Sequence, residues 1–140
     1  MITCCQLIAL TIIHKKARQY KPPAISHNFS TEEIMQKVST GKPFTVLFLI
    51  SGKPAPEDVN LANQLQIEHL AYLFRLEAEG KTCIFGPMLN DEKMRGIIIF
   101  NTTNKDDIQQ WMADDPWIRG GYLTYELYDW FTIPGQRIPG

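Results

Sequence analysis

Two short runs in this sequence, residues 44–50 (FTVLFLI) and residues 97–100 (IIIF), constrain the fold more than any other feature. Both are rich in β-branched and aromatic residues and are apolar at nearly every position, which is typical of buried strands. Because successive side chains of a strand point to opposite faces of the sheet, each run needs apolar cover on both faces. A fold built on these strands must therefore cover its sheet from two sides.

Helix-like and strand-like segments alternate around these two runs. We predict a strand at residues 44–50, a helix at 57–79, strands at 81–85 and 97–100, a helix from Asn104 to the Asp115-Pro116 step, and a last strand at 122–131. With right-handed crossovers, this βαββαβ order most simply gives a four-stranded antiparallel sheet with both helices on one face. The predicted fold class is therefore α+β, with a ferredoxin-like arrangement.

The predicted domain is residues 44–131, and a chain of 140 residues can bury one core without disulfides or a structural metal. Before it we expect an N-terminal extension at residues 1–43. It comprises an apolar run at 1–13, a proline-containing linker at 20–28, and a short helix that begins at Ser30 or Thr31 and ends at Gly41. Residues 132–140 are the expected C-terminal tail.

The sheet face that the helices leave open needs a partner. A second copy of the chain, packed face to face, is the simplest cover, so we predict a homodimer. The alternative is that the N-terminal residues 1–20 fold back over the sheet.

Charge and cysteine content exclude several classes of partner. With a net charge of −1, the chain offers no basic face for nucleic acid and no polybasic signal for a membrane. The apolar run at 1–13 is too short to span a bilayer and lies before its basic residues, the reverse of a secretory signal. Cys4, Cys5 and Cys83 lack metal-ligand spacing, which favours free thiols in the cytoplasm. Export, with residues 1–20 as a truncated signal, is the alternative.

His69 and Asp115 are the candidate catalytic residues. His69 lies in the apolar stripe of the predicted helix 57–79, so we expect its ring to face the sheet. Asp115 lies at the inner edge of the next helix, where Pro116 turns the backbone out of the helical region. If the two side chains meet, the carboxylate fixes the tautomer of the imidazole, which then serves as a general acid or base. The structural alternative is a satisfied core histidine and an aspartate that caps residues 116–119.

Tyr72, one helical turn after His69, is a candidate for the wall of a pocket or, alternatively, a core aromatic with its hydroxyl at the rim. The sequence contains no P-loop, dinucleotide-binding glycine pattern, GxSxG elbow or HExxH motif. We therefore predict no metal site and no cofactor.

Short motifs within residues 44–130 resemble those of the YciI-like, or YCII-related, family of the dimeric α/β barrel superfamily. They are EHLAYL at 68–73, EGK at 79–81, GP at 86–87, RG at 95–96, ADDPWI at 113–118 and GYL at 121–123. The resemblance implies a His-Asp pair at His69 and Asp115, in a small-molecule pocket between the sheet and the helices. Within that pocket we predict that Tyr72, Gly86 and Pro87 bind the substrate.

Relatives in this superfamily include a dehydrochlorinase of a chlorinated hydroxyquinol and muconolactone isomerase-like enzymes. The leading hypothesis is therefore a cofactor-independent lyase or isomerase that moves a proton on a small, aromatic or lactone-like molecule. The alternative is a non-catalytic small-ligand-binding or dimeric interaction domain in which His69 and Asp115 are structural.

Overall fold

The computed structural model describes residues 29–136 and residue 138. The apolar run, the linker, Cys4 and Cys5 lie outside the described residues. The chain divides into two units, Met1–Ile34 and Met35–Gly140. The sheet, its helices and the candidate site all belong to the second unit.

Helix α2 covers Thr31–Ser39. At its start, the Ser30 hydroxyl accepts from the Glu33 backbone N–H at 3.1 Å, and the Glu33 carboxylate accepts from the Ser30 N–H at 2.6 Å. This capping box confirms the predicted start of the helix. The helix ends before the predicted Gly41.

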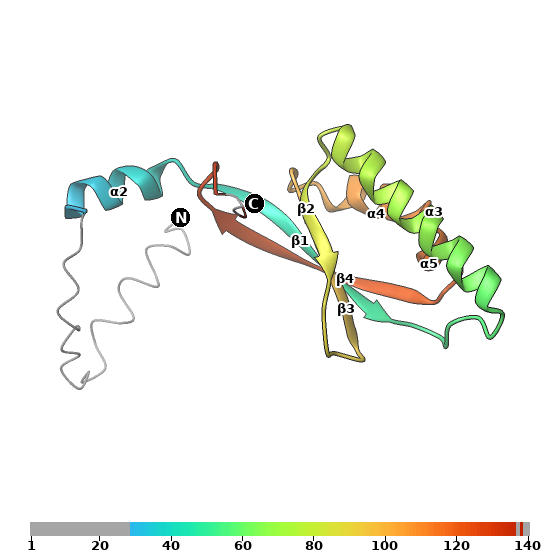
Figure 1. Ribbon diagram of the computed structural model, residues 1–140. Coiled ribbons are helices and arrows are strands. Elements are labelled where there is room, and N and C mark those ends of the chain that lie inside the picture. The colour runs from blue at the N-terminus through green and yellow to red at the C-terminus, as the bar shows by residue number, and fades with distance from the viewer. Residues whose placement is uncertain (1–28, 137, 139–140) are drawn as a thin grey trace. The chain divides into compact units, whose positions relative to one another are not determined.

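A four-stranded antiparallel sheet with strand order β2-β3-β1-β4 forms the centre of the second unit (Figure 1). The strands are β1 (Lys42–Ser51), β2 (Thr82–Pro87), β3 (Met94–Phe100) and β4 (Leu123–Thr132). In the middle of the sheet, Val46 of β1 lies opposite Ile99 of β3 and Tyr128 of β4. The βαββαβ chain order with this strand order is the predicted ferredoxin-like α+β arrangement.

The predicted boundaries of all four strands differ in part from those of the structure, and the end of β2 and the start of β3 matter most for the site. β3 begins at Met94 and not at residue 97, because Gly96 pairs with Leu49 of β1 and with Pro87 of β2. Pro87 is the last residue of β2, two residues beyond the predicted end of this strand at residue 85. A residue without a backbone N–H is tolerated there because β2 is an edge strand.

Helices α3 (Val59–Ala78), α4 (Lys105–Ala113) and α5 (Pro116–Arg119) lie on one face of the sheet (Figure 1). Asn104 caps α4 as predicted. Asp58, which was not predicted as a cap, caps α3, and each of the two side chains accepts two backbone N–H groups. The core between helices and sheet contains buried side chains from both layers, namely Leu47, Leu49, Leu73, Leu76, Ile98, Phe100, Ile108 and Met112. None of the described helices is long and apolar enough to span a bilayer.

The other face of the sheet, which we call the open face, carries the residues that alternate with the core positions. The apolar ones are Phe44, Val46, Phe48, Ile97, Ile99, Tyr128 and Trp130, and the charged Glu126 lies opposite Phe48 on the same face. Phe44 packs against Trp130, and Phe48 packs edge-on against Tyr128. Tyr128 is 49% exposed and Trp130 is 39% exposed. The described part of the chain therefore presents a largely apolar surface on the face that lacks helices, although Phe44 and Val46 are themselves buried.

Candidate active site

The structure brings His69 and Asp115 together although 46 positions separate them. His69 Nδ1 lies 2.5 Å from Asp115 Oδ2. Asp115 is fully buried and His69 is only 7% exposed. α3 places His69 on the same buried side as Leu73, while Asp115 lies between α4 and α5 as the N-cap of α5.

Asp115 also caps α5, as the structural alternative predicted. Its Oδ1 accepts the backbone N–H groups of Trp117 at 3.0 Å and Ile118 at 3.2 Å. The backbone of Asp115 is extended (φ −66°, ψ 127°), which Pro116 favours in the residue before it. Because the cap and the contact with His69 use different oxygens, the two roles of Asp115 coexist.

This arrangement selects one tautomer of the neutral imidazole. A carboxylate only accepts hydrogen bonds, so His69 Nδ1 must carry the hydrogen that it donates to Asp115 Oδ2. The lone pair of the neutral ring then lies on Nε2. His69 is thus oriented as a base at Nε2.

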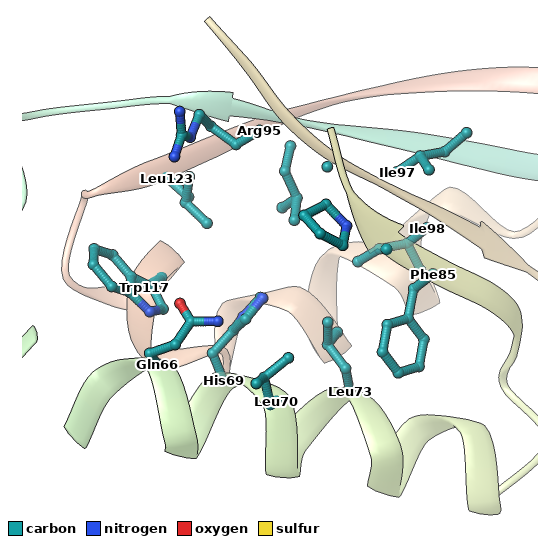
Figure 2. A pocket seen from close by; sticks show the side chains of 14 residues that line it. Gln66, His69, Leu70, Leu73, Phe85, Arg95, Ile97, Ile98, Trp117 and Leu123 are labelled. Carbon is teal, nitrogen blue, oxygen red and sulfur yellow. The ribbon is translucent and has the colours of Figure 1, made fainter. Parts of the chain in front are cut away.

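A cavity of about 480 Å³ is lined by His69. In Figure 2, His69 and Gln66 rise into it from α3, Trp117 approaches from α5, and strands β2 and β3 close the far side. Most of the wall is apolar, with Leu49, Leu70, Leu73, Phe85, Pro87, Ile97, Ile98 and Leu123. An apolar cavity with a few convergent polar groups is the usual form of a small-molecule site.

The predicted substrate-binding residues separate into two groups. Gly86 and Pro87 line the cavity at the end of β2. Tyr72 is not among the lining residues, which corrects its expected position. Its hydroxyl donates to the backbone carbonyl of Trp111 on α4, and burial raises the pKa of Tyr72. The acceptor on α4 satisfies the tyrosine hydroxyl away from the cavity.

Three polar residues of the wall, Gln66, Arg95 and Trp117, were not predicted as site residues. Gln66 lies one helical turn before His69, and Trp117 follows the Asp115-Pro116 step, so both had a positional signal. Arg95 had only the short RG motif at residues 95–96, and the structure makes it the extra residue of a β-bulge. Leu49 pairs with Gly96 and Ile50 with Met94, which leaves Arg95 unpaired in the β1–β3 ladder.

No group of three or more His, Cys, Asp and Glu side chains is placed to hold a metal ion in residues 29–136. Such clusters are how proteins usually bind zinc and related ions.

The model of the YCII-related domain family matches residues 46–131, more than half of the 140-residue chain. The chain belongs to the YCII-related family. No curated protein is significantly similar in sequence to this YCII-related chain.

Two solved structures resemble the YCII-related chain. A muconolactone isomerase is 14% identical over 69% of this chain and 97% of the isomerase, with a TM-score of 0.53. A 5-chloro-2-hydroxyhydroquinone dehydrochlorinase from Burkholderia phenoliruptrix AC1100, in complex with 2,5-dihydroxybenzoquinone, is 22% identical. That match covers 61% of this chain and 92% of the dehydrochlorinase, with a TM-score of 0.47. The likeness to the isomerase is one of fold and agrees with the predicted dimeric α/β barrel superfamily.

Proposed function

We propose that this YCII-related protein is a cofactor-independent lyase or isomerase in which His69 moves a proton and Asp115 holds the imidazole in place. One observation carries the proposal: a fully buried carboxylate binds Nδ1 of a histidine that lines an apolar cavity. Nε2 is then left for a bound molecule. A base with a fixed tautomer in an apolar cavity is suited to remove a proton from carbon.

The proposed reaction begins when Nε2 of His69 takes a proton from a carbon of the substrate. The electron pair of the broken C–H bond enters the adjacent π system, and the imidazolium is stabilised by Asp115. Return of the proton to a different carbon gives isomerisation. Departure of a leaving group with its electron pair from the neighbouring carbon gives elimination, after which His69 releases its proton to solvent.

The proposed substrate is a small, aromatic or lactone-like molecule. A cavity of about 480 Å³ with an aliphatic and aromatic wall suits a compact ring. Gly86 and Pro87 are proposed to contact that ring from β2. Muconolactone isomerase has a related fold, but a fold alone carries no activity from one protein to another. The proposal therefore depends on the site itself.

A second candidate function is a non-catalytic small-ligand-binding or dimeric interaction domain. It is favoured by the second role of Asp115, which caps α5 through two hydrogen bonds, and by the small exposure of His69. A buried hydrogen-bonded pair can serve specificity of folding alone. Under this function, the pair would stabilise the domain without moving a proton.

Deuterium incorporation from D₂O distinguishes the two functions. We would incubate the protein with small lactones and hydroxylated aromatic compounds and follow loss of C–H signals by ¹H NMR. α-Angelica lactone is the first probe, because removal of its ring proton and return to another carbon gives a distinct isomer. We expect exchange with the wild type and a loss of about 100- to 10,000-fold in His69→Gln and Asp115→Asn.

Asp114→Asn is the matched control, since Asp114 is the exposed neighbour of Asp115 and caps the end of α4. We expect this variant to keep the wild-type rate. A His69→Gln variant with the full rate would refute catalysis by His69. Binding of the probes without any exchange in the wild type would favour the second function.

We also propose that a second copy of the chain covers the open face and makes the protein a homodimer. The open face combines apolar strand residues with one tilted and one edge-on aromatic pair, and exposed apolar surfaces of this kind are typical of interfaces. Light scattering tests this: Tyr128→Asp should give a monomer, while Leu89→Asp, at a 78% exposed residue outside the sheet, should leave the dimer intact. A monomeric wild type would contradict the proposal.

We assign the activity to residues 44–131, with residues 1–43 as an extension and residues 132–140 as a tail. We propose the cytoplasm as its compartment.

A further inference from the structure

One buried polar group on the cavity wall has no partner. The indole Nε1–H of Trp117 makes no hydrogen bond to any described residue, although Trp117 lines the cavity. The hydroxyls of Thr45 and Thr82 are also buried and unpaired, but neither residue lines the cavity. Since buried donors in folded proteins are almost always paired, an unpaired donor at a cavity points to an acceptor on a ligand.

The indole of Trp117 is held in place before any ligand arrives. Its backbone N–H donates to Asp115 Oδ1, and its carbonyl accepts from the Tyr122 N–H at 3.0 Å. The ring meets the ring of Tyr122 edge-on, with centroids 5.4 Å apart. Asp115 therefore positions both residues. One of its oxygens binds the ring of His69, the base, and the other binds the backbone of Trp117, which carries the unpaired indole N–H.

The charges around the cavity favour a ligand oxygen that gains negative charge. None of the described lining residues is Asp or Glu, and Arg95 is the one lining residue with a permanent charge. The guanidinium of Arg95 donates to the backbone carbonyl of Asp91 at 3.2 Å. Asp115, behind the wall, is fully buried and already accepts three hydrogen bonds. The described lining side chains therefore include donors at Gln66, Arg95 and Trp117 and no carboxylate.

Three polar side chains line one end of the cavity. In Figure 2, the amide of Gln66 lies between the indole of Trp117 and the imidazole of His69. A molecule placed there can bring a carbon to His69 and an oxygen to Trp117 at once. Removal of a proton from the carbon beside a carbonyl group needs such a pair of groups, a base for the carbon and a donor for the oxygen.

We propose that Trp117 Nε1–H binds the carbonyl oxygen of the substrate, and that the substrates are compact carbonyl compounds with an acidic C–H beside that carbonyl. This inference rests on the proposed function and names its substrate class. When His69 takes the proton, the C–H electrons form a C=C bond and the carbonyl π electrons move to oxygen, which gives an enolate. Trp117 then donates to the oxygen that gains charge, so it stabilises the transition state more than the bound substrate.

The indole N–H resonance of Trp117 tests the recognition step directly. The chain has three tryptophans, whose indole signals are assigned with single Trp→Phe variants. We would titrate ¹⁵N-labelled protein with α-angelica lactone and with 2-methylfuran, a ring of similar size without a carbonyl. We expect the Trp117 N–H proton to move downfield with the lactone only, in the wild type and in His69→Gln. A signal that does not move at the highest soluble lactone concentration would overturn the inference.

Deuterium exchange tests the catalytic consequence. Trp117→Phe should lower kcat/KM for the lactone by about 100-fold. Replacing Trp117 by 3-benzothienylalanine, which keeps the two rings and lacks the N–H, should lower kcat/KM by a similar factor. This variant separates the loss of the donor from a packing defect. Trp111→Phe is the control, because Trp111 is a partly buried tryptophan outside the cavity wall.

The outcomes separate this inference from the proposed function. If the wild type exchanges deuterium and the variants without the Trp117 donor exchange it equally fast, the inference is refuted and proton transfer by His69 stands. A lactone-induced shift of Trp117 without exchange would refute the proposed function and leave the recognition of a carbonyl oxygen standing.

Discussion

Replacing Asp115 by asparagine separates its two roles, because its two oxygens have different partners. Oδ1 caps α5 through Trp117 and Ile118, and Oδ2 binds His69. In Asp115→Asn the amide oxygen can keep the cap, while the amide NH₂ takes the place of Oδ2. That group donates to Nδ1, so the imidazole must carry its hydrogen on Nε2. In the variant, Nε2 of His69 therefore carries a hydrogen and is a donor, whereas in the wild type it is a base.

The expected free energies of unfolding differ between asparagine and alanine at this position. Asp115→Ala loses the cap, which costs about 1 kcal/mol. It also leaves the buried Nδ1–H of His69 without an acceptor, which costs about 1–3 kcal/mol. The total of about 2–4 kcal/mol corresponds to a fall in Tm of about 10 °C or more. Asp115→Asn keeps three hydrogen bonds and should cost less than about 1 kcal/mol, yet lose about 100- to 10,000-fold in rate through the wrong tautomer.

Two measurements check this reasoning. Urea unfolding gives the stability of the wild type, Asp115→Asn and Asp115→Ala, with Asp114→Asn as the control. The ¹⁵N shifts of the imidazole, assigned among three histidines with His69→Gln, give the tautomer. We expect Nε2 to be the nitrogen without hydrogen in the wild type and Nδ1 in the asparagine variant. A wild-type ring with its hydrogen on Nε2, or an asparagine variant as unstable as alanine, would refute the reasoning.

Four further substitutions test the packing of the domain by urea unfolding. Tyr72→Phe should keep the reaction rate and cost about 1 kcal/mol at neutral pH, because its hydroxyl bonds to α4 and does not line the cavity. Burial raises the pKa of Tyr72, so Tyr72 ionises at a lower pH in the unfolded chain than in the folded one. The wild type should therefore lose stability above about pH 10, and Tyr72→Phe should lose less. Equal losses in the two proteins would contradict this explanation. A Cβ at Gly96 would lie 3.0 Å from the carbonyl oxygen of Gly86, so Gly96→Ala should cost about 1–3 kcal/mol. Gly86→Ala meets no atom within 4 Å and should change stability by less than about 0.5 kcal/mol; similar costs for both variants would disprove the steric account. Thr45→Val should stabilise the protein by up to about 1 kcal/mol, since it removes a buried hydroxyl without a partner, and a loss of stability would reveal a partner for that hydroxyl.

The strands and helices were predictable because their signals are local. The run at residues 44–50 is apolar on both faces, and it forms the middle of β1, which is covered by the core on one side. Asn104 and the Asp115-Pro116 step mark helix ends through bonds to nearby backbone groups. The boundaries of β2 and β3 were less predictable, because they depend on pairing with strands that are distant in sequence.

The site was predictable only where its residues carry a local signal in the sequence. His69 stands out as a polar residue in an apolar helix stripe, and Asp115 as an aspartate before proline, so both could be named in advance. Tyr72 shares the helical face of His69, but the Trp111 carbonyl on α4 binds its hydroxyl, which no spacing in the sequence reveals. Arg95 reaches the wall only because the β1–β3 ladder skips it.

The sequence by itself determined the order of elements, the ferredoxin-like fold class and the two residues most suited to acid-base chemistry. Each of these follows from periodicity, caps and residue chemistry over a few positions. Only the tertiary structure decided that Asp115 divides its oxygens between His69 and α5, and that the unpaired indole N–H of Trp117 belongs to the same cavity. These features depend on distances between side chains on separate elements, which packing sets and local sequence does not.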